Sequence, residues 1–150
     1  MLSRTIKGAA AGLAGTAALD LASYADMALR GRSASSAPEQ VVEELAKRTG
    51  QAIPGEGEER QNRVQALGAL AGIGTGVAVG AAAGEFSFVV RRLGPVLGPA
   101  LLGGAAMAAT DYGMKALGVS DPSTWDATSW ISDIVPHLAF GLVTWLVLTW

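Results

Sequence analysis

The residues that could do chemistry in this chain are ionisable or polar groups set within or beside apolar stretches. If those stretches cross a membrane, each intramembrane charge costs at least about 2.5 kcal/mol and is a functional candidate by default. Carboxylates beside an imidazole could relay a proton or bind a small ion. The candidate polar cluster consists of Asp20, Tyr24, Asp111, Lys115, Asp133 and His137.

The depths of these residues along their segments predict that they gather in one place. With helices that alternate in direction, Asp20 lies roughly 60% of the way along the first helix, and Asp111 lies at a similar fraction of the third. His137 falls near the start of the last helix, on the same side as the 125–130 loop. The structural alternative is that Asp111 and Lys115 form an i,i+4 pair and that Asp20 only accepts a hydrogen bond between helices.

Several chemistries are excluded by residue counts. One histidine and no cysteine rule out thiolate nucleophiles and a multi-histidine zinc site within one chain. Asp133 and His137, four residues apart, are explained by a capping aspartate beside an interfacial histidine, so no metal is predicted. No phosphate-binding loop or nucleophile elbow occurs, and we expect no catalytic residue, no cofactor and no enzyme activity.

The composition indicates a membrane protein. Half of the residues (50%) are hydrophobic and 16% are charged, whereas globular chains carry about 25% charged residues. The mean hydropathy of +0.35 is also high. The pI of 5.3 argues against a nucleic-acid partner, which requires a basic face. A chain of 150 residues has room for a single domain, residues 1–150.

A row of glycines at every fourth position, a glycine zipper, is the main packing signal. In water each interior glycine costs a helix about 1 kcal/mol, but in a bilayer an apolar segment must still be helical. Small residues four apart then let another helix backbone approach closely. The glycine row is Gly68, Gly72, Gly76, Gly80 and Gly84, and a matching face in the first helix is Gly8, Gly12 and Gly15.

These patterns predict an all-α fold, a transmembrane four-helix bundle with Gly/Ala-rich close packing. Both termini should lie on one side of the membrane. An amphipathic surface helix is expected at about 37–49, opened by a Ser36–Glu39 capping box and closed by Gly50. Tryptophans prefer the headgroup level, so Trp125, Trp130 and Trp150 are expected interface anchors. The spanning helices are expected at about 6–29, 64–88, 95–117 and 134–150.

One segment carries a family resemblance. The last part of the chain resembles the C-terminal end of the YagU-like family of small bacterial inner-membrane proteins. The residues that carry the resemblance are Leu117-Gly118, Trp130, Ser132-Asp133-Ile134 and His137, which an apolar helix follows. The resemblance implies a multi-pass protein of the bacterial cytoplasmic membrane with its N-terminus inside. The family has no established catalytic residues to carry over, and the glycine row here is much denser than in the family.

Three functions fit these observations. The preferred one is a non-enzymatic scaffold or accessory subunit, held in the lipid bilayer and binding another membrane protein or itself through its glycine faces. The alternative is a small transporter, channel or proton-handling protein that uses Asp20, Asp111 and His137. A weaker alternative is a haem-binding protein with His137 as one axial ligand.

Overall fold

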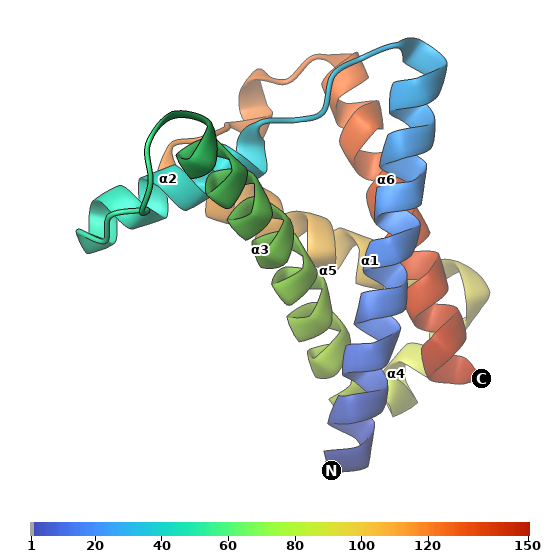
Figure 1. The fold of residues 1–150 in the computed structure, drawn as a ribbon. Coiled ribbons are helices and arrows are strands. Elements are labelled where there is room, and N and C mark those ends of the chain that lie inside the picture. The colour runs from blue at the N-terminus through green and yellow to red at the C-terminus, as the bar shows by residue number, and fades with distance from the viewer. Residues whose placement is uncertain (1) are drawn as a thin grey trace.

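The computed structural model describes residues 2–150, and the predicted all-helical class is confirmed for this part of the chain (Figure 1). Residues 2–150 contain no β-strand. The elements are α1 (Leu2–Arg30), α2 (Ala37–Thr49), α3 (Gly57–Glu85), α4 (Ser87–Arg92), α5 (Gly94–Leu117), the 3-10 turn η1 (Pro122–Thr124) and α6 (Ala127–Thr149).

Helices α1 and α6 run antiparallel and stay together along their length (Figure 1). Near one end Lys7 Nζ donates to the main-chain oxygen of Trp150 at 3.4 Å. At the other end Arg30 donates to the hydroxyl of Ser132. We call these the termini end and the loop end, since both chain termini lie at the first and the α5–α6 connection lies at the second.

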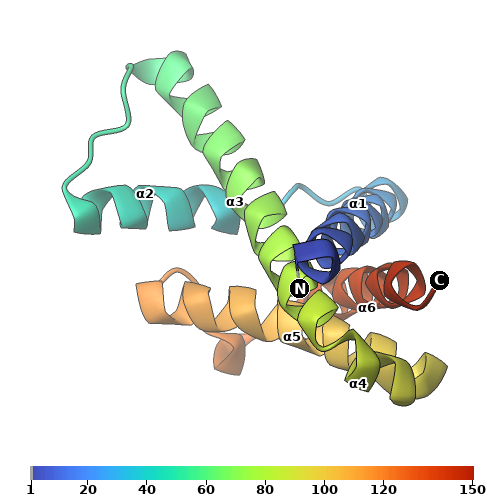
Figure 2. The same cartoon turned by 90° about the horizontal axis from the view of Figure 1, so that it is seen from below.

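Helices α3 and α5 diverge from the α1–α6 pair. In the view from below, α2 lies on one side and α1 and α6 lie on the other, while α5 crosses from beside α4 and α6 to the side of α2 (Figure 2). Helix α2 is tied to the end of α5, because Arg48 donates to the main-chain oxygens of Ala116 at 3.3 Å and Leu117 at 2.9 Å. The long helices therefore form a splayed assembly rather than a parallel-sided four-helix bundle.

Several helix bounds differ from those expected. Helix α6 begins at Ala127 instead of about 134, because the Asp126 carboxylate caps it by accepting the Ser129 N–H at 2.7 Å. Pro136 therefore lies inside the helix rather than at its start. Helix α3 begins at Gly57 instead of about 64 and ends at Glu85 instead of about 88.

Helix α2 spans the expected residues, Ala37–Thr49, but it lacks the expected capping box. Ser36 has φ −90° and ψ 4°, outside the extended region in which an N-cap side chain reaches the first free N–H groups. Its hydroxyl instead accepts a hydrogen bond from Gln40 Nε2 at 2.9 Å. At the other end, Gly50 adopts the left-handed conformation with φ 67° and ends the helix as expected.

Among residues 2–150, two helices are long and apolar enough to cross a membrane, α3 and α6. Only 22% of the apolar window of α3 and 33% of that of α6 are buried. The core helix of a soluble protein would bury most of such a window, so the apolar surface of α3 and α6 favours contact with lipid or with another chain. A four-span arrangement that includes α1 and α5 stays a prediction.

Candidate functional site

Helices α1 and α3 are in backbone contact through their glycines. A methyl group added at Gly80 would lie 2.5 Å from Gly12 Cα, and one added at Gly8 would lie 2.9 Å from Gly84 Cα. Gly76 and Gly12 also face each other, so the register is antiparallel. Real Cβ atoms do not approach other atoms this closely, so these helices can cross as they do only with glycine at the contact.

The rest of the predicted glycines face other neighbours or none. A methyl group at Gly68 would lie 3.1 Å from Pro38 of α2, and one at Gly15 would lie 2.9 Å from a ring carbon of Phe140 in α6. Gly72 has nothing within 4 Å. The glycine row therefore faces several neighbours in turn, because a row of residues four apart turns by about 40° per step around the helix.

Phe140 fills the place where α1, α3 and α6 meet. Its side chain is 1% exposed and lies against both Gly15 and Gly76. Two buried threonines stand beside it: Thr16 donates to the main-chain oxygen of Gly12 at 2.9 Å, and Thr144 donates to that of Ala11 at 3.4 Å. Sequence reasoning missed these threonines, although Thr16 continues the Gly8, Gly12 spacing and could have been found from it.

A second close crossing joins α5 and α6. A methyl group at Gly103 would lie 2.5 Å from the main-chain oxygen of His137. One at Gly141 would lie 2.5 Å from Gly103 N and 2.9 Å from Gly103 Cα. Gly98 lies against the indole of Trp145. The signal in the sequence is Gly141, the only glycine in the last apolar segment.

Near this crossing the structure brings Asp111, Asp133 and His137 together. His137 Nδ1 lies 2.9 Å from the main-chain oxygen of Asp133 and 3.3 Å from its Oδ1, so both neighbours of Nδ1 are acceptors and Nδ1 carries the hydrogen. The charges of Asp133 and His137 act on Asp111 across the α5–α6 contact. Asp111 and His137 are buried, with 7% and 8% of their surface exposed.

Two oxygen atoms of this group are buried without a hydrogen-bond partner among residues 2–150, namely Asp111 Oδ1 and Asp133 Oδ2. An unpaired buried carboxylate oxygen is costly and marks a place where a proton or a ligand would be favourable. In the described part of the chain, no three acidic or histidine side chains are placed to hold a metal ion. Asp111 and Asp133 are therefore the buried carboxylates of this group that a proton would neutralise.

The predicted six-residue cluster is wrong for three of its members. Asp20 lies on an exposed face of α1, and Tyr24, one turn later, is 64% exposed. At about 100° per residue, Asp20 points roughly 140° away from the buried Gly15, so similar depth along a helix did not mean the same face. Lys115 pairs with Asp121 at 3.0 Å, which also replaces the expected Asp111–Lys115 pair.

The connection between α5 and α6 is built on Asp121 and two tryptophans. The main-chain N–H of Ser123, followed by the Lys115 ammonium, lowers the pKa of Asp121 to about 2. Trp125 and Trp130 stack edge to face with ring centroids 5.2 Å apart, and Trp125 Nε1 donates to the Ser120 hydroxyl at 2.9 Å.

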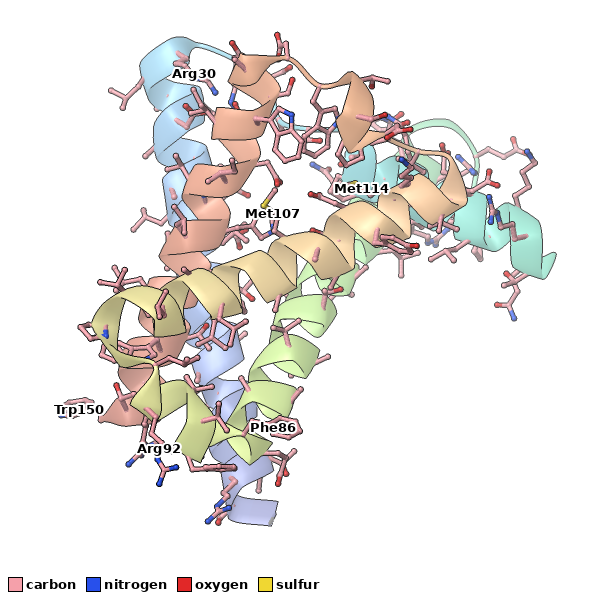
Figure 3. The ribbon with its side chains drawn as sticks, turned by 180° about the vertical axis from the view of Figure 1, so that it is seen from behind. Arg30, Phe86, Arg92, Met107, Met114 and Trp150 are labelled. Carbon is pink, nitrogen blue, oxygen red and sulfur yellow. The ribbon has the colours of Figure 1, made fainter. Side chains whose placement is uncertain are left out.

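Two labelled residues mark the opposite ends of the molecule (Figure 3). Trp150 is fully exposed at the termini end, and Arg30 stands at the loop end. The Trp125–Trp130 pair and Trp150 therefore lie at opposite ends, as anchors for two membrane surfaces would. Their position at headgroup level stays a prediction.

The sequence matches no family model, no curated protein and no solved structure. The resemblance to the YagU-like family therefore stays a prediction. A function for the chain has to be inferred from its own geometry.

Proposed function

We propose that this chain is a non-enzymatic integral membrane protein of the bacterial cytoplasmic membrane that acts as a scaffold or accessory subunit. The observation that supports this most directly is how the helices are joined. They meet backbone to backbone at two glycine crossings, while large apolar side chains point outward from all four long helices. Such packing suits a bilayer, where small residues rather than apolar burial bring helices together.

The splay of α3 and α5 favours a partner. Gly72 and Gly74 on α3 and Gly104 on α5 have nothing within 4 Å. Leu70 on α3 is 62% exposed and Leu101 on α5 is 52% exposed. These faces have the small-residue and apolar character that a neighbouring membrane helix requires, so the occupant is another membrane protein or a second copy of the chain.

The absence of cysteine makes this assembly testable in the membrane. A Gly72→Cys variant should form cross-linked species in native membranes, and the purified protein should have a mass in mild detergent above that of one chain. Leu13→Cys, on an exposed part of α1, is the matched control for random collision. Equal cross-linking of both variants together with a monomeric mass and no bound protein would contradict the scaffold function.

A second candidate function, proton handling, is favoured by the buried oxygens of Asp111 and Asp133 beside His137. In liposomes loaded with a pH-sensitive dye, the protein should then dissipate a proton gradient. Asp111→Asn should abolish this flux, while Asp20→Asn should retain it because Asp20 stands outside the group. If the unaltered protein carries no flux, Asp111 has no part in proton transfer, and Asp111→Asn, which keeps the size of the side chain, should then be nearly neutral for stability.

A further inference from the structure

The two ends of the molecule differ in how their charges are neutralised. Near the loop end, arginine and lysine side chains pair with carboxylates: Asp26 with Arg30 and Arg32, Glu44 with Arg48, Glu43 with Arg60, Glu59 with Arg63, and Asp121 with Lys115. At the termini end, Arg4, Lys7, Arg91 and Arg92 have no Asp or Glu carboxylate within 4.0 Å among residues 2–150. Glu85 also lies at this end, where its carboxylate accepts a hydrogen bond from the Thr5 hydroxyl, so four cations stand beside this acidic side chain and positive charge accumulates.

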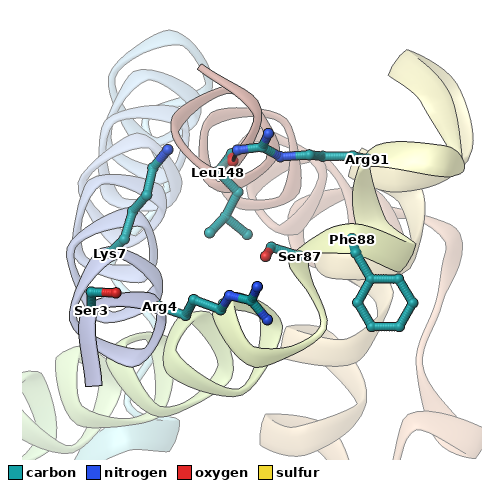
Figure 4. Close-up of a pocket in the computed structure, with 8 residues that line it drawn as sticks. Ser3, Arg4, Lys7, Ser87, Phe88, Arg91 and Leu148 are labelled. Carbon is teal, nitrogen blue, oxygen red and sulfur yellow. Dashed lines mark hydrogen bonds between the residues drawn. The ribbon is translucent and has the colours of Figure 1, made fainter. Parts of the chain in front are cut away.

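Three of these four cations line one pocket (Figure 4). The pocket has a volume of about 410 Å³ and lies between the start of α1, helix α4 and the end of α6. Arg4 and Lys7 come from α1 and Arg91 from α4, so segments far apart in the sequence meet at this pocket. Ser3 and Ser87 add two hydroxyl groups to its wall.

Main-chain oxygens hold two of these cations in place. Arg91 Nη2 donates to the main-chain oxygen of Leu148 at 2.9 Å, and Lys7 Nζ donates to that of Trp150 at 3.4 Å. Arg4 makes no side-chain hydrogen bond within residues 2–150, and its guanidinium points into the space between α1 and α4. The remaining N–H groups of Arg4, Lys7 and Arg91 are thus available to an anion.

We propose that this pocket binds the phosphate group of an anionic phospholipid. Guanidinium and ammonium groups together with hydroxyls form the donor set that a phosphate requires, and basic pockets at the ends of membrane helices bind acidic headgroups. Phe88, which also lines the pocket, is 58% exposed, so an apolar surface adjoins the charged one. A lipid uses both surfaces, whereas a free phosphate ion uses only the cations. The proposal needs the chain to lie in a membrane but does not depend on the scaffold role.

Thermal unfolding in mild detergent tests this directly. Added phosphatidylglycerol should raise the midpoint more than phosphatidylcholine, at concentrations where inorganic phosphate alone has little effect. Arg4→Gln should bind phosphatidylglycerol about fivefold more weakly, the ratio expected for one cation near an anionic surface. Arg91→Gln should also weaken the binding of phosphatidylglycerol. This variant loses the contact with Leu148 as well, so if it fails to fold, Arg4→Gln alone provides the test.

Arg92→Gln is the matched control, because Arg92 carries the same charge on α4 but does not line the pocket. It should keep the full stabilisation by phosphatidylglycerol. An equal loss in Arg92→Gln and Arg4→Gln would overturn the pocket in favour of a diffuse surface attraction. If inorganic phosphate stabilises the protein as much as phosphatidylglycerol does, the ligand is a phosphate ion and not a phospholipid. If phosphatidylglycerol stabilises the protein no more than phosphatidylcholine does, the pocket does not bind an anionic headgroup.

Discussion

The α1–α3 crossing can be tested by adding one methyl group at two places on the same helix. Gly80→Ala puts a methyl group 2.5 Å from Gly12 Cα and 2.6 Å from Gly12 N. Gly72→Ala, two turns earlier on α3, puts the same methyl group where nothing lies within 4 Å. The two variants have the same change in composition and differ only in what the methyl group meets.

The magnitude follows from comparing the two variants. Each replacement removes a glycine from a helix interior, which favours the helix by about 1 kcal/mol in water, and this effect largely cancels in the difference. The remaining cost is overpacking, typically about 1–3 kcal/mol. The atoms struck at Gly80 belong to the α1 backbone, so no side-chain rotation relieves the clash, and we expect about 3 kcal/mol.

Thermal unfolding of both variants in the same mild detergent, followed by circular dichroism, gives the comparison. At about 2–4 °C per kcal/mol for a chain of this size, Gly80→Ala should melt about 6–12 °C below Gly72→Ala. Gly72→Ala should melt at or slightly above the unaltered protein. If Gly80→Ala melts at the same temperature as Gly72→Ala, the helices do not touch at this glycine and the reasoning is refuted.

Three further predictions concern the topology, the α5–α6 connection and α2. In intact cells, Ser35→Cys and Phe86→Cys should react with an impermeant thiol reagent from opposite sides of the membrane; labelling of both from one side would exclude the spanning topology. The pKa of Asp121 is lowered from 3.8 to about 2 in the folded protein, so its ionised carboxylate stabilises the fold. This stabilisation is complete above about pH 4 and is lost as the pH falls toward 2. Tryptophan fluorescence should show this acid transition, and Asp121→Asn should remove it; a transition of the same size in both would assign it elsewhere. Arg48→Gln should speed amide hydrogen exchange in residues 37–49 about tenfold, because about 1.4 kcal/mol of charged hydrogen bonding to α5 is lost. Unchanged exchange would show that Arg48 does not hold α2 against α5.

The helices were largely predictable because their signals are local. The span of α2 follows from its apolar stripe and from Gly50, and the end of α5 follows from Gly118, which adopts the left-handed conformation with φ 74°. The start of α6 was missed because the Pro136 signal was given more weight than the capping signal of Asp126. Proline is favoured at a helix start but is also tolerated inside apolar membrane helices.

The candidate site was predictable only in part because it depends on which way each helix faces. The depth of Asp111 and His137 along their segments correctly placed them near each other. The same reasoning failed for Asp20, since depth does not fix the rotation of α1, which is set by its glycines packing on α3 and α6. The basic pocket was beyond reach because Arg4 and Arg91 meet only after four helices are arranged in space.

The pairing of the first long helix with the last has a consequence for how the protein is made. Thr144 bonds to Ala11, 133 residues earlier, and Arg30 bonds to Ser132 over a separation of 102 residues. At about 5–20 residues per second, a ribosome needs about 7–27 seconds to cover that first separation. Throughout this interval the side of α1 that will receive Phe140 stays uncovered, and once Gly84 has been made only the glycine contact with α3 can hold α1 in register. The α1–α3 pair must therefore survive insertion on its own, as the template onto which α6 packs once it has been made.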